Sequence, residues 1–423
     1  MDNRFSGLFN LTEAQAIEIL DGPANDSDEA SSRYIAASHL VNFNTEGAIA
    51  ALLRAVDNDA PDLDNRIVRR KAVESLGRLK VKAALPILKS CLDDEDNYLV
   101  ENTAWALGEI GTDNATTLEK LAQQLERPGQ SYRTIIHTLA NLGYVPAAER
   151  IEKFVTSDSA PIASAARAAL YQLKGDAQQM QPVLEFLQST NVNARRGSIQ
   201  DLIDARYFKA IPNISQCPVS MVFRLRAIRS LLQAGMAAGE LTFTQAQPWL
   251  EKTLRDHPDT VALVHEYASP LEIGLLVQEL YGTDFGRCYL ASQAILSQHA
   301  DQPEMAIAAL LQSYESAGYN DYGAHYHIMR LFGWLKATKA YDLLVEALHN
   351  RSPQFQKSRV AAAIALGELG QPAAIDELKS ALDVPIWDLQ YAAIMALLSL
   401  GVPPAEISPE VDDWLVQEKL KSL

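Results

Sequence analysis

The stretch from Asn65 to Gly111 decides the fold, because it states one pattern twice. Its first copy reads Ile67-Val68-Arg69-Arg70-Lys71-Ala72-Val73-Glu74-Ser75-Leu76-Gly77, and its second reads Leu99-Val100-Glu101-Asn102-Thr103-Ala104-Trp105-Ala106-Leu107-Gly108. The anchor leucines of the two copies, Leu76 and Leu107, are 31 positions apart. A repeat of about 30 residues with two apolar helical runs predicts a solenoid of stacked helix pairs.

The same anchor recurs along most of the chain, so we expect the solenoid to extend through it. The anchor returns at Leu139, Leu170 and Leu202, and again at Leu366 and Leu397. We therefore predict an all-α, right-handed superhelix of HEAT- or armadillo-like helix pairs with a crescent shape. The expected segments are an N-terminal helix with an acidic loop (1–30), regular repeats (31–210), an irregular bend or insertion (211–284), and further repeats with a capping helix (285–423).

Two positions of each repeat, six and two residues before the anchor, share one face of the predicted second helix. In HEAT-type pairs this helix lines the concave wall, so its side chains form a candidate ligand-binding surface. The residues proposed for this surface are Arg70, Glu101, Trp105, Arg133, His137, Arg196 and Arg330, together with Arg224 from a helix that carries three arginines. A solvated helix face with ordinary charge pairs four residues apart is the alternative explanation.

Composition argues against several classes of protein. The net charge of −16 argues against nucleic acid as a partner, because phosphate binding needs a basic surface. Cys91, Cys217 and Cys288 have no paired spacing, which argues against a disulfide framework and a zinc site and favours a reducing compartment. There is no signal peptide and no apolar run of about 18 residues, so we expect no membrane span. Familiar nucleotide-binding, zinc-protease and hydrolase motifs are also missing.

One segment departs from the alanine- and leucine-rich pattern. Tyr319-Asn320-Asp321-Tyr322-Gly323-Ala324-His325-Tyr326-His327 contains three tyrosines, two histidines and a carboxylate. We expect Asn320 or Asp321 to cap the following helix, and we expect side chains at this helix start to be accessible. The candidate catalytic residues, able to hold N–H donors and exchange protons, are Tyr319, Asp321, Tyr322, His325 and His327. The two histidines lack the spacing of a helical metal site, so no metal is expected. A capped, aromatic-rich turn without chemistry is the alternative.

Several irregular stretches carry motifs that a generic HEAT array would not share. They are Leu8–Ala16, Ser32–Leu40, Asp64–Lys71, Ser198–Leu202, Pro218–Ser220, Val222–Arg226, Thr283–Ala291, Asn320–His325 and Gln354–Arg359. Together they resemble the phycoerythrin-type bilin lyases of the E/F clan, and the resemblance covers nearly the whole chain. Members of that clan attach open-chain tetrapyrroles to cysteines of phycobiliproteins, and some also isomerise phycoerythrobilin to phycourobilin.

The resemblance implies a substrate, a partner and a compartment. The chain is expected to attach phycoerythrobilin, as a substrate and not a tightly bound cofactor, to a phycoerythrin subunit, with the alpha subunit favoured. The reaction is expected in the cytoplasm, near phycobilisome assembly. The nucleophilic thiolate belongs to the partner, which explains why this chain needs no cysteine motif. Tyr319 stands where simple lyases of the clan carry other residues, so lyase and lyase-isomerase activities both stay open.

The resemblance also implies roles for the candidate residues. Arginines of the wall would pair with the propionates of the bilin, and Trp105 with tyrosines would cover its conjugated face. Asp321 with a flanking tyrosine would move protons. A non-catalytic HEAT scaffold or chaperone that grips the same subunit is the alternative function. The sequence leaves open the oligomeric state, the modified cysteine and any need for a second lyase subunit.

Overall fold

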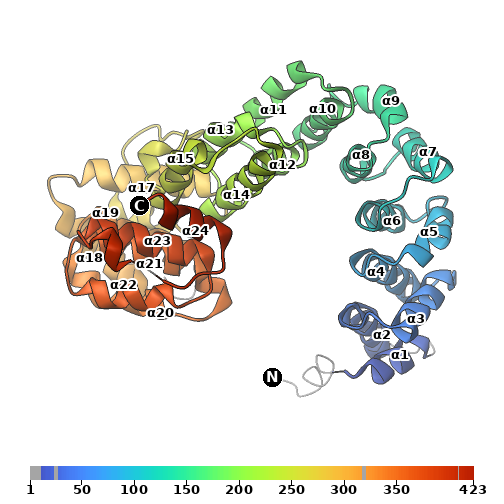
Figure 1. Ribbon diagram of the computed structural model, residues 1–423, viewed down its shortest axis with the longest axis horizontal. Helices are drawn as coiled ribbons and strands as arrows, with labels where there is room; N and C mark the ends of the chain where they lie inside the picture. Colours follow the sequence, from blue (N-terminus) through green and yellow to red (C-terminus); the bar gives the residue numbers. More distant parts are fainter. Residues whose placement is uncertain (1–10, 23–26, 317–320, 408) are drawn as a thin grey trace. The chain divides into compact units, whose positions relative to one another are not determined.

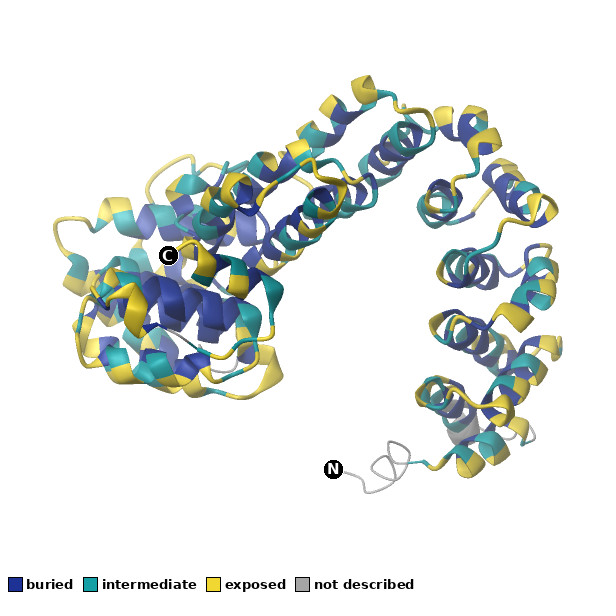
Figure 2. Cartoon of the chain, in the orientation of Figure 1, coloured by how far each residue is buried: buried dark blue, intermediate teal, exposed yellow. Residues whose placement is uncertain are grey.

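A computed structural model of the chain describes residues 11–22, 27–316, 321–407 and 409–423. Its regular elements in these ranges are α-helices and short 3₁₀ turns, without a strand (Figure 1). The predicted all-helical repeat fold is confirmed. Residues on the helix faces that meet one another are buried, and residues on the outer faces are exposed or intermediate (Figure 2). None of the helices in the described part is long and apolar enough to cross a bilayer.

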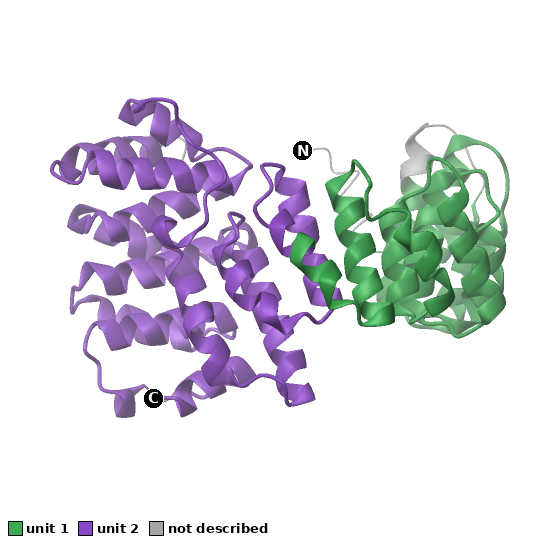
Figure 3. Ribbon diagram, turned by 90° about the horizontal axis from the view of Figure 1, so that it is seen from above, with its two compact units in different colours: residues 1–182 green, residues 183–423 purple. Residues whose placement is uncertain are grey.

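The chain divides into two compact units, residues 1–182 and residues 183–423 (Figure 3). We call them unit 1 and unit 2. Their boundary lies within the segment 31–210 and inside the helix α11 (Met180–Phe186). Each unit is described separately below.

Unit 1 is a double layer of helices. The first layer holds α1 (Glu13–Asp21), α3 (Glu46–Asp57), α5 (Leu85–Cys91), α7 (Ala115–Gln123) and α9 (Ala148–Glu152). The second layer holds α2 (Ser27–His39), α4 (Leu63–Arg78), α6 (Asn97–Ile110), α8 (Tyr132–Asn141) and α10 (Ala160–Lys174). Each second-layer helix packs against the next and against its first-layer partner (Figure 1). Contacts therefore run mainly between neighbouring repeats, as in other solenoids.

The N-terminal segment confirms one prediction and corrects another. Thr12 caps α1: its hydroxyl accepts the N–H of Gln15, and the Gln15 side chain accepts the N–H of Thr12. The acidic loop predicted up to residue 30 is shorter, because α2 begins at Ser27. Serine and acidic residues favour a helix N-terminus, so this acidic run suits a first helical turn as well as a loop.

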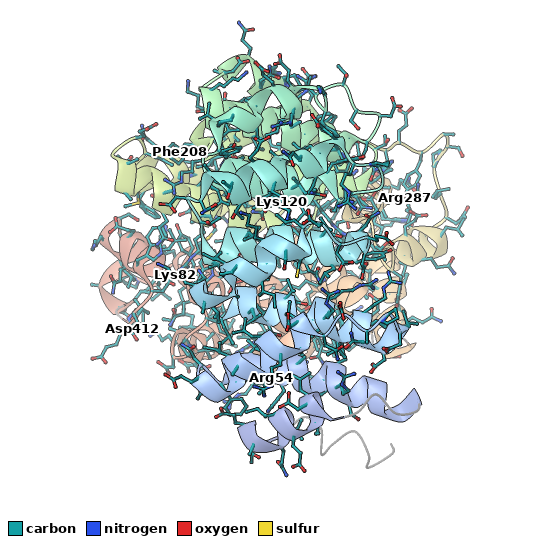
Figure 4. The ribbon with its side chains drawn as sticks, turned by 90° about the vertical axis from the view of Figure 1, so that its right-hand side faces the viewer. Arg54, Lys82, Lys120, Phe208, Arg287 and Asp412 are labelled. Atoms are coloured by element: carbon teal, nitrogen blue, oxygen red, sulfur yellow. The ribbon has the colours of Figure 1, made fainter. Side chains whose placement is uncertain are left out.

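Figure 4 looks onto the first layer of unit 1, where Arg54, Lys82 and Lys120 are labelled on successive repeats. Arg54 pairs with Asp21 at 2.6 Å, and Lys120 pairs with Asp93. Each of these pairs links one repeat to the preceding one. The outer face of unit 1 is therefore a solvated surface with ion pairs between repeats.

Unit 2 also has a second layer of helices, and one further helix, α15 (Phe243–Arg255), contacts members of that layer far apart in sequence. Its second layer holds α12 (Val192–Asp204), α14 (Met221–Ala238), α17 (Phe285–Gln298), α19 (Tyr322–Trp334), α21 (Gln356–Leu369) and α23 (Trp387–Ser399). The other helices are α13 (Ile211–Gln216), α15 (Phe243–Arg255), α16 (Ile273–Glu279), α18 (Pro303–Ser316), α20 (Tyr341–His349), α22 (Ala374–Leu382) and α24 (Trp414–Lys421). The segment expected to be irregular, 211–284, is mostly helical. Its helix α15 packs against α13 and α14 and also against the much later α21.

The glycine that follows the anchor leucine marks where second-layer helices cross, as at Gly77 and Gly367. A Cβ atom added to Gly77 would lie 2.9 Å from the Cα of Ala106, and one added to Gly367 would lie 2.7 Å from the Cα of Ala396. These distances are too short for real side-chain atoms, so a larger residue would push the two helices apart. The sequence repeat therefore records a repeated backbone-to-backbone contact in both units.

Six second-layer helices end in the same turn. In each, an N–H group donates to the carbonyl oxygen five residues earlier at 2.9–3.1 Å, as Val81 does to Leu76 and Glu240 does to Gly235. The residue before this donor has a positive φ, and the six are Lys80, Gly143, Arg206, Gly239, Lys336 and Gly401. This combination is the Schellman motif, which ends the helix and turns the chain into the next repeat.

Candidate functional site

Arg70, the first of the predicted wall residues, is engaged within unit 1. Its Nε and Nη2 atoms donate to the two carboxylate oxygens of Asp96 at 2.7 and 2.8 Å, and its guanidinium lies 4.7 Å from the ring centre of Tyr98. Burial alone would raise the pKa of Asp96, but hydrogen bonds and charges from Arg70, the Tyr98 N–H and Arg66 hold it below its ordinary value. Arg70 therefore joins α4 to the capping residue of α6.

The other wall residues of unit 1 also connect neighbouring helices. Glu101 accepts hydrogen bonds from Ser131 Oγ at 2.8 Å and Thr134 Oγ1 at 3.2 Å, and Arg133 Nη1 donates to the Pro161 carbonyl at 2.6 Å. Trp105 is half-buried against Gly77 at the crossing of α4 and α6. His137 is half-buried on α8. The structure thus places these residues in one layer, and Glu101 and Arg133 make hydrogen bonds to the next repeat.

In unit 2, Arg196 on α12 donates to the Thr283 carbonyl at 3.2 Å and lies 5.3 Å from the ring centre of Phe223. The adjacent Arg195 is fully buried and pairs with Asp284, which caps α17 through the Gly286 N–H at 2.8 Å. A Cβ on Gly286 would lie 3.2 Å from Arg195 Nη2, so a larger residue would crowd the pair. Sequence reasoning missed this pair, although the stretch Thr283–Ala291 contained its signal.

The centre of unit 2 is a buried polar network of Arg224, Asp256, Tyr289 and Tyr326. The Asp256 carboxylate accepts hydrogen bonds from Arg224 Nη2, from the Tyr326 hydroxyl, and from the Tyr289 hydroxyl at 2.7 Å. Arg224 also donates to the Tyr289 hydroxyl at 2.7 Å and to the carbonyls of Val219 and Ser215. All four side chains are fully buried. They join α14, the C-terminal end of α15, α17 and α19.

This burial contradicts the prediction that Arg224 offers its guanidinium to a propionate. Asp256, Tyr289 and two carbonyl oxygens already accept its hydrogen bonds. Burial would lower the pKa of Arg224, but the charge of Asp256 raises it, so the cation is held in place. Burial and the charge of Asp256 raise the pKa of the Tyr326 hydroxyl well above its ordinary value, and burial does the same for Tyr289. Arg224 therefore stays cationic, and both phenols stay protonated.

Arg330 is also buried, which contradicts its predicted place on an open wall. Its Nη2 atom donates to the Arg255 carbonyl, and its guanidinium pairs with Glu368 at 3.2 Å and lies 4.7 Å from the ring centre of Trp334. Arg330 and Tyr326 are one helical turn apart on α19. Two polar links therefore fix α19 to the end of α15.

The start of α19 is capped as predicted. Asp321 Oδ1 accepts the N–H groups of Gly323 at 2.9 Å and Ala324 at 2.8 Å, and the side chain is half-buried. Tyr322 is 48% exposed, and its ring meets that of Phe355 edge-on at 5.2 Å. Tyr319 lies outside the described residues. Asp321 and Tyr322 are thus the described members of the predicted cluster that remain accessible.

The expectation of accessible side chains is wrong for His325 and His327, because both are fully buried. The ring of His327 lies 4.6 Å from that of Phe285, 5.1 Å from that of Tyr326 and 5.5 Å from that of Tyr289. Burial lowers the pKa of His327 to about 3 and that of His325 to about 4, with a smaller contribution from the charge of Lys357. Only the first turn of α19 is open, since the next turn packs between α17 and α21. Both imidazoles are therefore neutral near pH 7.

Lys357, in the first turn of α21, is a residue that sequence reasoning missed. Its half-buried ammonium lies 4.8 Å from the ring centre of Phe285 and 5.8 Å from that of Tyr326. Burial lowers the pKa of Lys357, and the charge of Asp321 acts in the opposite direction. The signal was the stretch Gln354–Arg359, which contains this lysine. We call Asp321, Tyr322 and Lys357 the α19–α21 edge.

The α19–α21 edge combines a carboxylate, a phenol and an ammonium. This set can pair with an anionic group, contact a flat conjugated ligand and exchange protons. Within the described ranges, no three His, Cys, Asp or Glu side chains are placed to hold a metal ion. The edge is the candidate site.

Comparison with known proteins places the chain among bilin-related HEAT proteins. The family model "HEAT repeats" matches residues 62–134 and 307–398. The chain is 54% identical, over 100% of both lengths, to the "uncharacterized phycocyanin operon protein Y" of Pseudanabaena tenuis. It is 31% identical to the bilin biosynthesis protein CpeY of a Synechococcus species, over 88% of this chain and 90% of that protein.

Two further comparisons involve lyase subunits. The phycocyanobilin lyase subunit alpha of Thermosynechococcus vestitus is 33% identical over 52% of this chain and 86% of that protein. The solved complex of CpcE and CpcF of phycocyanin lyase from a Nostoc species matches with a TM-score of 0.50 and 26% identity, over 58% of this chain and 94% of that chain. The chain belongs to the HEAT-repeat family of E/F-type bilin lyases, which includes CpeY and the phycocyanobilin lyase alpha subunits.

Proposed function

We propose that this protein attaches a linear tetrapyrrole to a cysteine of a phycobiliprotein. The observation that carries the proposal is the alignment with the bilin biosynthesis protein CpeY over 88% of the chain. The phycocyanobilin lyase alpha subunits, whose name states the reaction, align with about half of the chain and support the same chemistry. Similarity to the CpcE–CpcF complex supports the same type of helical framework.

The pigment that we propose is phycoerythrobilin, and the proposed acceptor is a phycoerythrin subunit, with the alpha subunit favoured. The resemblance of the irregular stretches to phycoerythrin-type lyases supports this choice. The relative with 54% identity carries a name that refers to the phycocyanin operon. The experiment therefore offers the enzyme phycoerythrin and phycocyanin subunits in parallel.

The proposed reaction is an addition that needs no oxidant or reductant. The sulfur of the acceptor cysteine forms a bond to the ethylidene carbon of ring A, and the ring takes up one proton. Asp321 is the group that we propose for this proton transfer, because its half-buried carboxylate lies at the open first turn of α19. Isomerisation, as a further step, removes one proton and returns one, which shifts a double bond between rings A and B. Asp321 and Tyr319 are the residues that we propose for it.

A single substitution tests the role of Asp321. Asn caps a helix about as well as Asp, so Asp321→Asn should leave helicity and melting unchanged. A neutral amide cannot take up a proton near pH 7, so attachment or isomerisation should fall about a hundredfold to ten-thousandfold. Co-expression with each acceptor subunit and a bilin-producing pathway, followed by absorption spectra of the purified subunit, measures both activities.

The matched control is Asp62→Asn, which changes the exposed capping residue of α4 in unit 1. It should leave both activities unchanged. Tyr319→Phe should lower isomerisation more than attachment. Full product with the wild-type spectrum from Asp321→Asn would leave Asp321 as a helix cap alone.

A non-catalytic scaffold or chaperone for the same subunit is the second candidate function. The observation that favours it is the internal pairing of Arg70, Arg224 and Arg330, which were expected to bind propionates. Free phycoerythrobilin distinguishes the candidates. A lyase should shift its absorption on mixing, whereas a scaffold should retain the subunit and leave the pigment spectrum unchanged.

A further inference from the structure

Lys357 stands in an electrostatically unfavourable position. It occupies the first turn of α21, where the helix dipole disfavours a cation. Its ammonium is half-buried against the rings of Phe285 and Tyr326. Cation–π contacts offset only part of the cost of removing an ammonium from water. Such a placement costs stability unless another group compensates for it.

Lys357 has no ion pair at 4.0 Å or less and no hydrogen bond from Nζ to any group in the described part of the chain. Other lysines with little exposure are paired: Lys71 with Glu74 at 2.6 Å, and Lys419 with Glu251 at 2.7 Å. The nearby Asp321 affects the pKa of Lys357, but its Oδ1 atom is used to cap α19. Among the described residues, no side chain or carbonyl group accepts from this ammonium, so its donors stay available for a further group.

The neighbouring groups indicate what that group is. An ammonium with free donors at the N-terminal end of a helix favours an anion, and the backbone N–H groups of α21 add to the same field. The exposed ring of Tyr322 packs on Phe355, which lies two residues before Lys357 at the start of α21. Together they suit a ligand that has both a carboxylate and a flat conjugated surface. A tetrapyrrole with propionate side chains has both.

We infer that Lys357 binds a propionate carboxylate of the tetrapyrrole at the α19–α21 edge. This inference rests on the proposed function and adds to it the residue that orients the pigment. The carboxylate replaces the missing counterion of Lys357, and Asp321 then lies on the same edge as the bound pigment. Lys357 is therefore a positioning residue, while Asp321 keeps the proton-transfer role.

The test measures binding apart from catalysis. Wild-type protein, Lys357→Met and Lys357→Arg are titrated with free phycoerythrobilin and with its propionate dimethyl ester, and pigment absorption is followed. Lys357→Met should weaken binding of the free acid by about tenfold or more, since it removes one charge-assisted bond. Lys357→Arg should restore most of this binding because it keeps the charge. The ester should bind the wild type and Lys357→Met with equal, weaker affinity.

The matched control is Lys339→Met, which removes an equal charge from an exposed lysine that pairs with Glu304 at 2.6 Å. It should bind both pigments as the wild type does. Melting of Lys357→Met should stay equal or rise, because the variant loses an unpaired, desolvated charge and keeps the apolar stem.

Three outcomes would overturn the inference. Equal binding of the free acid by the wild type and Lys357→Met would remove Lys357 from the pigment site and leave the proposed lyase activity standing. A parallel loss of acid and ester binding in Lys357→Met would indicate contact with the conjugated face instead of a carboxylate. Absence of any spectral change with wild-type protein would contradict the proposed function and the inference together.

Discussion

Unit 1 and unit 2 use charged side chains in different ways. Unit 1 has ion pairs that join consecutive repeats, as in Arg70–Asp96 and Arg33–Asp64, with at least one partner partly exposed. Unit 2 encloses the Arg224–Asp256 pair completely and ties it to Tyr289 and Tyr326. Tyr326 and Asp256 are 70 positions apart, more than two repeats. Contacts between adjacent repeats stabilise unit 1, whereas in unit 2 a buried polar network also joins helices that are distant in sequence.

Ion pairs of unit 1 hold stacked repeats together, whereas the buried network of unit 2 fixes the position of one helix, α19. A buried ion pair adds little net stability over well-packed apolar residues, but it tolerates few alternative arrangements. The network of unit 2 therefore fixes the position of α19 relative to the C-terminal end of α15. The α19–α21 edge lies at the open end of that helix. In the described part of unit 1, ion pairs join neighbouring repeats and no helix is held by a fully buried pair of this kind.

The comparison predicts the largest loss of stability for Asp256→Asn. Asn tolerates the left-handed backbone of this position (φ 48°), so the variant removes the charge and spares the turn. Leaving Arg224 buried without its counterion should cost about 3–5 kcal/mol of unfolding free energy. Urea unfolding followed by tryptophan fluorescence measures this loss in a Trp105→Phe background. In that background the fluorescence reports on unit 2, because the remaining four of the five tryptophans lie there. Asp259→Asn, at an exposed carboxylate, is the control, and a loss below about 1 kcal/mol would make the two units equivalent.

Substitutions at the helix crossings should cost similar stability in both units, whereas substitutions of buried charged residues should cost more in unit 2. Gly77→Ala and Gly367→Ala each place a methyl group against the backbone of the next helix. Each should cost about 1–3 kcal/mol through overpacking, measured by thermal melting and urea unfolding. Gly274→Ala, where nothing lies within 4 Å of the added atom, should be neutral. A neutral Gly367→Ala beside a costly Gly77→Ala would mean that unit 2 does not share the repeat contact.

Acid should weaken unit 2 through its buried histidines. The folded pKa of His327 is lowered to about 3, below the ordinary value of about 6.5, so the unfolded chain binds the proton first. The contribution is fully present above pH 6.5 and is lost progressively as the pH falls from about 6.5 towards 3. For this group alone, the loss between pH 7 and pH 5 is about 2 kcal/mol. Urea unfolding of His327→Phe at both pH values should show that much less acid sensitivity, and an unchanged pH dependence would contradict the neutral, buried state.

The smallest effect is expected for Arg70→Met in unit 1. Asp96 keeps the Tyr98 N–H and the charge of Arg66, so one partly exposed pair is lost. The expected cost is about 1 kcal/mol or less, measured by hydrogen exchange of the amides of α4 and α6. A cost as large as that of Asp256→Asn would erase the distinction between the units.

The repeat and its helices were predictable because their signal is local. The anchor leucines and their 31-residue spacing identified α4, α6, α21 and α23, and residue type limited the cap of α19 to Asn320 or Asp321. Such features depend on neighbours in the chain or on the next repeat. They need no knowledge of how distant segments meet.

The buried network was not predictable in the same way. Asp256 ends α15 in a stretch that read as an irregular bend, and its partners come from three other helices. Arg224 and Arg330 look like any surface arginine in sequence, because burial depends on the helix packed above them. His325 and His327 were misjudged for the same reason. Lys357 was missed because its importance lies in having no counterion within 4.0 Å among the described residues, which only three-dimensional contacts reveal.

The shared helix ending has a consequence for engineering. Lys80, Arg206 and Lys336 adopt the left-handed conformation that Gly143 and Gly401 hold without strain. A non-glycine residue there costs about 1–2 kcal/mol, and glycine returns roughly half of that gain as chain entropy. Three widely separated copies thus keep a small reserve of stability that conversion to glycine could release independently. Lys80 and Arg206 lie outside α19 and α21, so glycine at these two positions changes neither helix of the α19–α21 edge.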